Sequence, residues 1–225
     1  MSITNDADSS GPSSPLAHAT ANQPDRVLIV SIVLIGSTTA RTVSSVTYNS
    51  VSMSLIDAVG TSDGDNSRVE FWKLVAPATG THDIAYTLSG AFDGAEFVGG
   101  TTWYGVDQST VNRTASKNTF GTDASHQSDT LTPTSSVGDI VIDCMGFRYS
   151  GQGTVTLGGS QTQIWSQNSV SHIGSYKAGA AGTTTMTISW ATDDWTPASY
   201  VAFALIPVAA AGGKPASYYQ MMRSA

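Results

Sequence analysis

The chain contains few charged side chains. Asp, Glu, Lys and Arg make up 12% of its 225 residues, about half of the roughly 25% that is usual in soluble domains. Seventeen acidic residues outnumber ten basic ones, which gives a formal net charge of −7 at pH 7. The basic residues form no cluster, so the chain lacks the surface with which proteins neutralise nucleic-acid phosphates. We therefore expect no nucleic-acid partner.

Residues that build metal and catalytic sites are also scarce. Cys144 is the only cysteine, so neither an intramolecular disulfide nor a zinc site with several cysteine ligands can form. The four histidines are far apart, and no metalloprotease, P-loop or dinucleotide-binding motif occurs. Residues 60–64 fit the G-x-S-x-G pattern around Ser62, but a strand follows them where a nucleophile elbow needs a helix. We expect neither a cofactor nor an enzymatic activity.

An export signal and long apolar runs are missing too. Residues 1–25 place no Lys or Arg before an apolar run and no small-residue cleavage site after one. The first apolar run, Val27–Ile35, has nine residues, whereas a membrane span needs roughly 20. We expect no secretory signal and no membrane association. A protein that works outside cells without such a signal can leave by assembling into a particle released at lysis, which predicts a virion location.

What the chain does contain is a series of short β-type segments separated by turn residues. Ser and Thr supply about a quarter of the residues. Val27–Ile35 is typical of a central strand covered on both faces. Asn49 and Ser50 indicate a tight hairpin turn between 42–48 and 51–56. The other predicted strands are 68–75, 82–88, 96–106, 139–147, 154–157, 162–165, 183–190 and 200–207, with a short one near 129–132.

About ten strands without a helical pattern predict an antiparallel β-sandwich, and jelly-roll and immunoglobulin-like connections both remain open. We expect three parts: an N-terminal arm over 1–25, a β-sandwich domain over 26–208 and a C-terminal arm over 209–225. Residues 107–138 are predicted to be a long polar connection.

Two sets of residues are candidates for binding small ligands. Asp63, Asp65 and Asn66 supply three oxygen-bearing side chains in a Gly-containing loop, as calcium sites do, although a turn that these side chains bond internally is the favoured interpretation. Trp103 and Trp195 lie near predicted strand ends beside Asp, Asn or Gln. They are candidates for stacking on a glycan, and core packing is the alternative.

The C-terminal arm is the candidate for binding a protein partner. An Ala/Gly spacer precedes a segment that is rich in the side chains enriched at protein interfaces. The predicted partner-binding residues are Tyr218, Tyr219, Met221, Met222 and Arg223.

Five segments of the sequence carry a resemblance. They are Asp25–Val30, Val46–Asn49, Gly64–Pro77, Gly105–Gln108 and Trp190–Trp195. Together they resemble a β-sandwich module that recurs in tailed-phage virion proteins and in large bacterial surface proteins, and the resemblance covers roughly residues 16–208. It implies a scaffold and no catalytic residues.

These observations lead to one expected function and one alternative. We expect a structural protein of a phage virion, a capsid decoration protein that docks on the particle through its arms and loops. Its expected partners are other virion proteins and copies of itself. The alternative is a carbohydrate-binding or adhesion module of a tail fibre or surface protein, with a glycan as its ligand.

Overall fold

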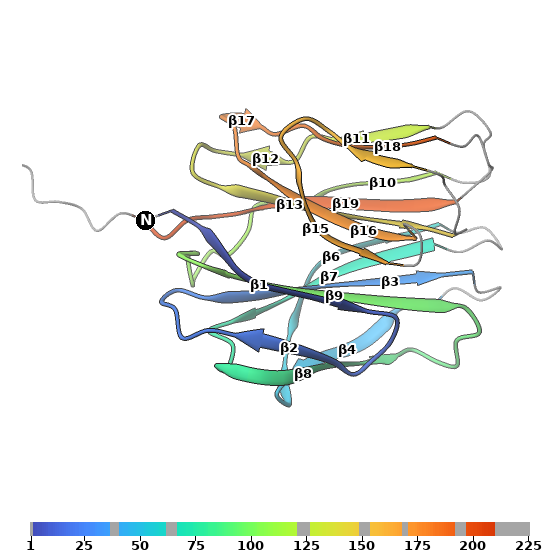
Figure 1. Cartoon of the computed structure of the whole chain (residues 1–225), viewed down its shortest axis with the longest axis horizontal. Coiled ribbons are helices and arrows are strands. Elements are labelled where there is room, and N and C mark those ends of the chain that lie inside the picture. Colours follow the sequence, from blue (N-terminus) through green and yellow to red (C-terminus); the bar gives the residue numbers. More distant parts are fainter. Residues whose placement is uncertain are drawn as a thin grey trace, which may run out of the picture.

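The computed structural model describes residues 2–36, 41–61, 67–120, 127–148, 154–167, 171–191 and 197–209. These residues form antiparallel β-sheets and contain no helix, so nothing in them could cross a membrane as a helix. The predicted all-β, antiparallel class is therefore confirmed. Figure 1 shows the sheets as stacked layers.

Two sheets come from the first half of the chain. The first inner sheet has the strand order β1 (Thr4–Gly11), β9 (Ala95–Tyr104), β3 (Val27–Ile35), β7 (Ser67–Val75) and β6 (Ser54–Gly60). The first outer sheet has the order β2 (Leu16–Thr20), β8 (Gly80–Leu88), β4 (Val43–Tyr48) and β5 (Val51–Ser52).

The second half of the chain forms another such pair. The second inner sheet has the order β10 (Ser116–Phe120), β19 (Ala198–Leu205), β13 (Ile140–Phe147), β16 (His172–Ala178) and β15 (Thr162–Gln167). The second outer sheet has the order β11 (Ser128–Leu131), β18 (Met186–Trp190) and β14 (Val155–Leu157). A short ladder joins β12 (Thr134–Ser135) to β17 (Gly182–Thr183).

The four main sheets stack with the two inner sheets face to face and one outer sheet on each side (Figure 1). An apolar cluster fills each of the three gaps between neighbouring sheets. Representative buried residues are Leu28, Tyr48 and Ile84 in the first gap, Ile29, Phe71 and Phe203 in the middle gap, and Met145, Ile188 and Tyr200 in the third.

The strand order of the second half repeats that of the first. If β1, β9, β3, β7 and β6 are replaced by β10, β19, β13, β16 and β15, the first inner sheet becomes the second. The same replacement turns β2, β8 and β4 of the first outer sheet into β11, β18 and β14. In each half the last strand lies between the first strand and the central one. The chain is thus an internal structural duplication.

The two halves also face each other in a roughly two-fold arrangement. β3 contacts its own counterpart β13, whereas β1 contacts β15 and β6 contacts β10, which are the exchanged pairs that a local two-fold axis requires. Turns at equivalent places share a left-handed backbone. Gly80 and Gly182 have φ of 98° and 88°, and Asp25 and Gly138, two residues before the central strands, have φ of 52° and 97°.

The central strands agree with the sequence prediction. All nine residues of β3 are buried, because β7 and β9 pair with its two edges and a sheet packs on each face. The hairpin turn is confirmed as well: Asn49 and Ser50 have φ of 48° and 64°, and Tyr48 pairs with Val51 across them. Two consecutive positive φ values define the turn type that suits a two-residue hairpin.

Two expectations about irregular segments were wrong. Much of the predicted N-terminal arm forms β1 and β2, which pair with β9 and β8. β1 is an edge strand whose side chains are mostly half-exposed, so its sequence carries no apolar alternation to reveal it. The predicted connection over 107–138 contains β10, β11 and β12, and among these only β11 was foreseen. β16 was also missed.

The indole of Trp165 fills a slot between the two inner sheets. It is 2% exposed and lies against Gly174 of its own sheet and Gly99 of the facing sheet. A Cβ added at Gly174 would be 2.2 Å from Trp165 Nε1, and one added at Gly99 would be 2.8 Å from Trp165 Cδ2. Neither glycine leaves room for a side chain, so the two residues set how closely the sheets approach around the ring.

We predict that Gly174→Ala lowers the free energy of unfolding by about 1–3 kcal/mol, because the added methyl group does not fit into the filled slot. Gly159→Ala is the matched control, since a Cβ there meets nothing within 4 Å; it should change stability by less than about 0.5 kcal/mol. Urea denaturation measures both. Equal stability of the two variants would contradict the conclusion that Gly174 leaves no room for a side chain beside Trp165.

Candidate functional site

The best-defined polar groups of the molecule are buried between its sheets. His172 on β16 is fully buried, and its Nε2 lies 3.0 Å from Oγ of Ser31 on β3, in a hydrogen bond that joins the two inner sheets. The ring of Phe97 stacks on the imidazole, with centroids 6.3 Å apart. Burial lowers the pKa of His172 to about 3, because the apolar surroundings disfavour the charged ring.

A second histidine joins the first inner and outer sheets. His18 on β2 is 1% exposed. Its Nδ1 lies 2.7 Å from Ser9 Oγ, and its Nε2 lies 2.7 Å from Thr102 Oγ1. Burial lowers the pKa of His18 to about 4, with a smaller opposing effect of Asp6.

Each pair brings a serine hydroxyl to an imidazole, as in enzymes that activate a nucleophile with a base. An efficient general base has a pKa near the working pH. The low pKa values of His18 and His172 make both rings weak bases at neutral pH. Both rings are also shielded from solvent. The geometry therefore supports a structural role, in which neutral imidazoles hydrogen-bond hydroxyls across the gaps between sheets.

Asp143 on β13 is the most deeply buried carboxylate among the described residues. It accepts hydrogen bonds from Tyr200 Oη at 2.6 Å and from Ser175 Oγ and N at 2.6 and 2.8 Å, and Gln161 Nε2 lies 3.2 Å away. Burial raises its pKa to about 6, although these hydrogen bonds act in the opposite direction. Gln161 Oε1 also accepts from Thr187 N, so the network connects the second inner and outer sheets.

Two other buried carboxylates hold neighbouring segments in the same way. Glu70 accepts from the backbone N–H of Val43 at 3.0 Å and from Trp72 Nε1 at 3.1 Å, and it pairs with Arg68. Asp139 pairs with Arg113 at 2.6 Å and accepts from the backbone N–H of Ser136. The carboxylates in the interior are thus engaged by protein donors.

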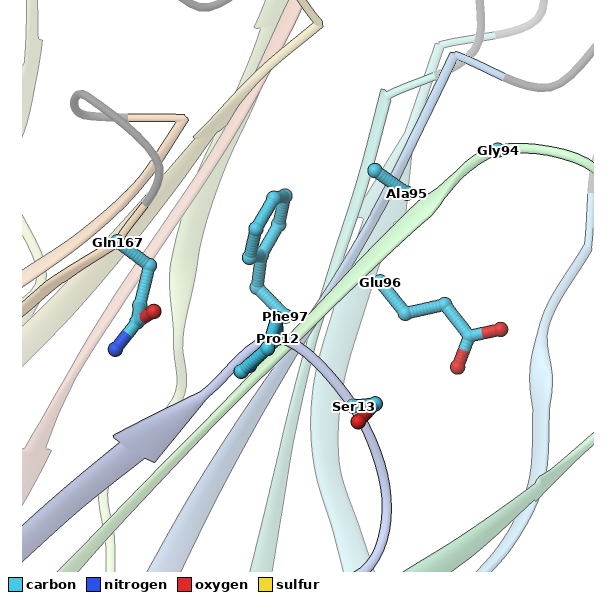
Figure 2. Close-up of a pocket in the computed structure, with 7 residues that line it drawn as sticks. All are labelled: Pro12, Ser13, Gly94, Ala95, Glu96, Phe97 and Gln167. Carbon is cyan, nitrogen blue, oxygen red and sulfur yellow. The ribbon is translucent and has the colours of Figure 1, made fainter.

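An open groove lies at the surface, at one end of the first inner sheet. Its volume is about 610 Å³, within the range of roughly 300–1,000 Å³ found for small-ligand pockets. Three separate segments line it: the β1–β2 loop, the start of β9 and the end of β15. Figure 2 shows the lining residues Pro12, Ser13, Gly94, Ala95, Glu96, Phe97 and Gln167.

The polar lining of this groove consists of acceptors and a hydroxyl. Tyr86 donates to Glu96 Oε2 at 2.5 Å, which fixes the carboxylate and leaves Oε1 to face a ligand. Gln167 donates through Nε2 to Ser10 Oγ at 2.7 Å, so its carbonyl Oε1 is left as an acceptor. Pro12 and the edge of Phe97 supply apolar surface. No Lys or Arg is among the described lining residues.

The structure places the two glycan candidates differently. Trp103 is 1% exposed, and its ring packs edge-on against Tyr176, with centroids 5.0 Å apart. No sugar can stack on a ring in that position, which corrects the hypothesis for Trp103. Trp195 lies outside the described residues.

The other candidate residues also lie outside the described part of the chain. These are Ser62, Asp63, Asp65 and Asn66 in the loop and Tyr218, Tyr219, Met221, Met222 and Arg223 in the C-terminal arm. The flanks of two of these segments are neighbours, because Ser199 Oγ donates to the backbone carbonyl of Ser67 at 2.8 Å. Ser67 and Ser199 therefore lie at the same end of the inner sheets.

Among the described residues, no group of three or more His, Cys, Asp and Glu side chains could hold a metal ion. Cys144 is fully buried, and burial raises the pKa of its thiol. Comparisons with family models, curated proteins and solved structures found no match to this chain.

Sequence reasoning missed the groove. Its polar residues come from positions 13, 96 and 167, which only the pairing of β1 with β9 and the contact of β1 with β15 bring together. The one local signal was Glu96 at the start of a predicted strand, and it does not distinguish a groove from any exposed strand end.

We predict that Asp143→Asn changes the pH dependence of stability in a defined direction. The folded-state pKa of about 6 exceeds the ordinary value near 4, so the carboxyl contributes stability below pH 4 that is lost as pH rises towards 6. Relative to the variant, the native chain should lose about 2 kcal/mol of unfolding free energy between pH 4 and pH 7. Urea denaturation across this range measures the difference, and parallel profiles would contradict the assignment.

Proposed function

We propose that this chain is a non-catalytic structural protein of a tailed-phage virion, a decoration protein that docks on the capsid surface. The observation that carries the proposal is how the buried polar groups are used. His18 and His172 form hydrogen bonds that join one sheet to the next, and Asp143 is linked to the next sheet through Gln161, which accepts from Thr187 N. Side chains that could act in catalysis thus hold the stacked sheets together. A protein that must keep its shape outside the cell requires such links.

The layered architecture supports the same role. We propose that each half is an antiparallel β-sandwich. Its chain passes repeatedly between inner and outer sheet, which favours jelly-roll over immunoglobulin-like connections. The duplication gives one chain two similar modules back to back. The resemblance of several sequence segments to virion β-sandwich modules agrees with this proposal.

A carbohydrate-binding or adhesion module is the second candidate. The groove with Glu96 and Gln167 offers acceptors for sugar hydroxyls. It offers little of the aromatic face on which sugars stack, because Phe97 is only 4% exposed. The structural role is therefore favoured.

The proposed function predicts that the chain is part of the mature particle. Virions of the phage whose genome encodes it, purified by density gradient and digested for quantitative mass spectrometry, should contain its peptides in a fixed ratio to the major capsid protein. Nuclease-treated lysate from which particles have been removed is the control. Peptides found only in that lysate would overturn the proposal.

A shortened chain should separate folding from docking. Ending the chain at Ala209 keeps the last described backbone bond, from Val208 N to Gly105 O, so the melting temperature should stay within about 2 °C of the full chain. Particle binding should be lost, because the predicted anchors are removed. A chain ending at Leu205 also loses the bonds of Ile206 to Val111 and Asp107 and should melt earlier. Undiminished particle binding by the chain ending at Ala209 would exclude the C-terminal arm as the anchor.

A further inference from the structure

The groove at the start of β9 is suited to a cationic ligand. Glu96 presents a carboxylate oxygen, Gln167 a carbonyl oxygen and Ser13 a hydroxyl, and Tyr86 holds the carboxylate in place. A lining of acceptors favours a ligand that brings donors. The edge of Phe97 and the ring of Pro12 add surface for the apolar part of such a ligand.

The chain itself has a segment of matching charge. Residues 1–209 contain seventeen acidic and eight basic side chains, a formal charge of −9, whereas residues 210–225 contain Lys214 and Arg223 and no acidic side chain. Each of the eight basic residues of the body has a partner. They are Arg26, Arg41, Arg68, Lys73, Arg113, Lys117, Arg148 and Lys177. The C-terminal segment thus carries the remaining basic side chains of the chain, Lys214 and Arg223.

Distance favours the segment of a second copy over that of the same chain. The last described residues lie beside Gly105, at the far end of β9 from the groove. Eight residues of strand separate Tyr104 from Glu96, a distance of roughly 27 Å. Lys214 follows Ala209 by five residues, which span at most about 18 Å. Arg223 follows Ala209 by fourteen residues, which can span roughly 46–50 Å, so the same chain can bring Arg223 to the groove but not Lys214, whereas a neighbouring copy can present both.

We propose that the groove lined by Pro12, Ser13, Glu96, Phe97 and Gln167 binds the C-terminal segment, residues 210–225, of a second copy of this chain. A basic side chain of that segment donates to Glu96, and Gln167, on the other side of β9 in Figure 2, accepts from a second donor of the segment. Its neighbouring Tyr and Met side chains pack on Pro12. This link would join copies of the protein to one another, which goes beyond its docking on a particle.

Self-association of the full chain tests the proposal, and sedimentation equilibrium measures it. The full chain should self-associate, and the chain ending at Ala209 should be monomeric. Glu96→Gln keeps an acceptor for Tyr86 but removes the charge, and it should raise the dissociation constant about tenfold. Higher salt should weaken association of the native chain and affect Glu96→Gln less.

Asp83→Asn is the matched control, because it also removes one negative charge. Asp83 is exposed and lines a second groove on the first outer sheet with Thr47, Thr81 and His82. The dissociation constant of the Asp83→Asn variant should stay within about twofold of the native value. Equal effects of the two substitutions, a larger effect of Asp83→Asn, or self-association of the chain ending at Ala209 would overturn the proposal, as would a full chain that stays monomeric.

A disulfide crosslink identifies the copy that supplies the segment. The native Cys144 is buried, so the combination of Ser13→Cys and Gln220→Cys should form a specific bond under mild oxidation and give a dimer on a non-reducing gel. Thr156→Cys with Gln220→Cys is the control, because Thr156 is exposed on the second outer sheet, and it should not crosslink. A product of monomer mass would assign the segment to its own chain and overturn the proposal. Neither assay contains a particle, so their failure is distinct from failure of the proposed function.

Discussion

The arrangement of the whole molecule depends on the burial of its two inner sheets on both faces. β3 and β19 have no exposed residue, so each inner sheet needs a covering layer on either side. The two inner sheets face each other, so each covers one face of the other. An outer sheet must then cover the remaining face of each inner sheet. A two-layer arrangement would leave one apolar face of β3 in water, at a cost of about 25 cal/mol for each Å² exposed.

This depth of burial also determines how polar groups are used. A buried polar group without a partner destabilises a fold by roughly 1–3 kcal/mol, and three of the buried groups lie in gaps between sheets. Ser31 and His172 meet across the middle gap, His18 and Thr102 across the first, and Gln161, which donates to Asp143, meets the backbone N–H of Thr187 across the third. Because hydrogen bonds are directional, these pairs fix the lateral position of one sheet on the next, which apolar contacts alone do not.

The elements that could be predicted from the sequence are those with a local pattern of apolar or turn-forming residues. β3 and the Asn49–Ser50 turn were predictable because an unbroken apolar run and a pair of turn residues are local signals. β1 was not, since a polar edge strand such as Thr4–Gly11 looks like an arm. The sequence also carries no sign of the duplication, because equivalent positions carry chemically different residues. The fifth residue is Ser31 in β3 and Cys144 in β13, and both face the opposite inner sheet. The groove depends on tertiary pairing and left no local pattern.

The placement of the last strand of each half has a consequence for how the chain folds during synthesis. β9 lies between β1 and β3, and β19 lies between β10 and β13. Neither inner sheet can close until its final strand has left the ribosome. The first half can close once Tyr104 has emerged, but its inner face then waits for the second half, which closes only when Leu205 is made. Pairing between strands that are distant in the sequence slows folding. In addition, the apolar face of the first inner sheet stays uncovered during most of the synthesis of the second half, because the sheet that covers it is not yet complete.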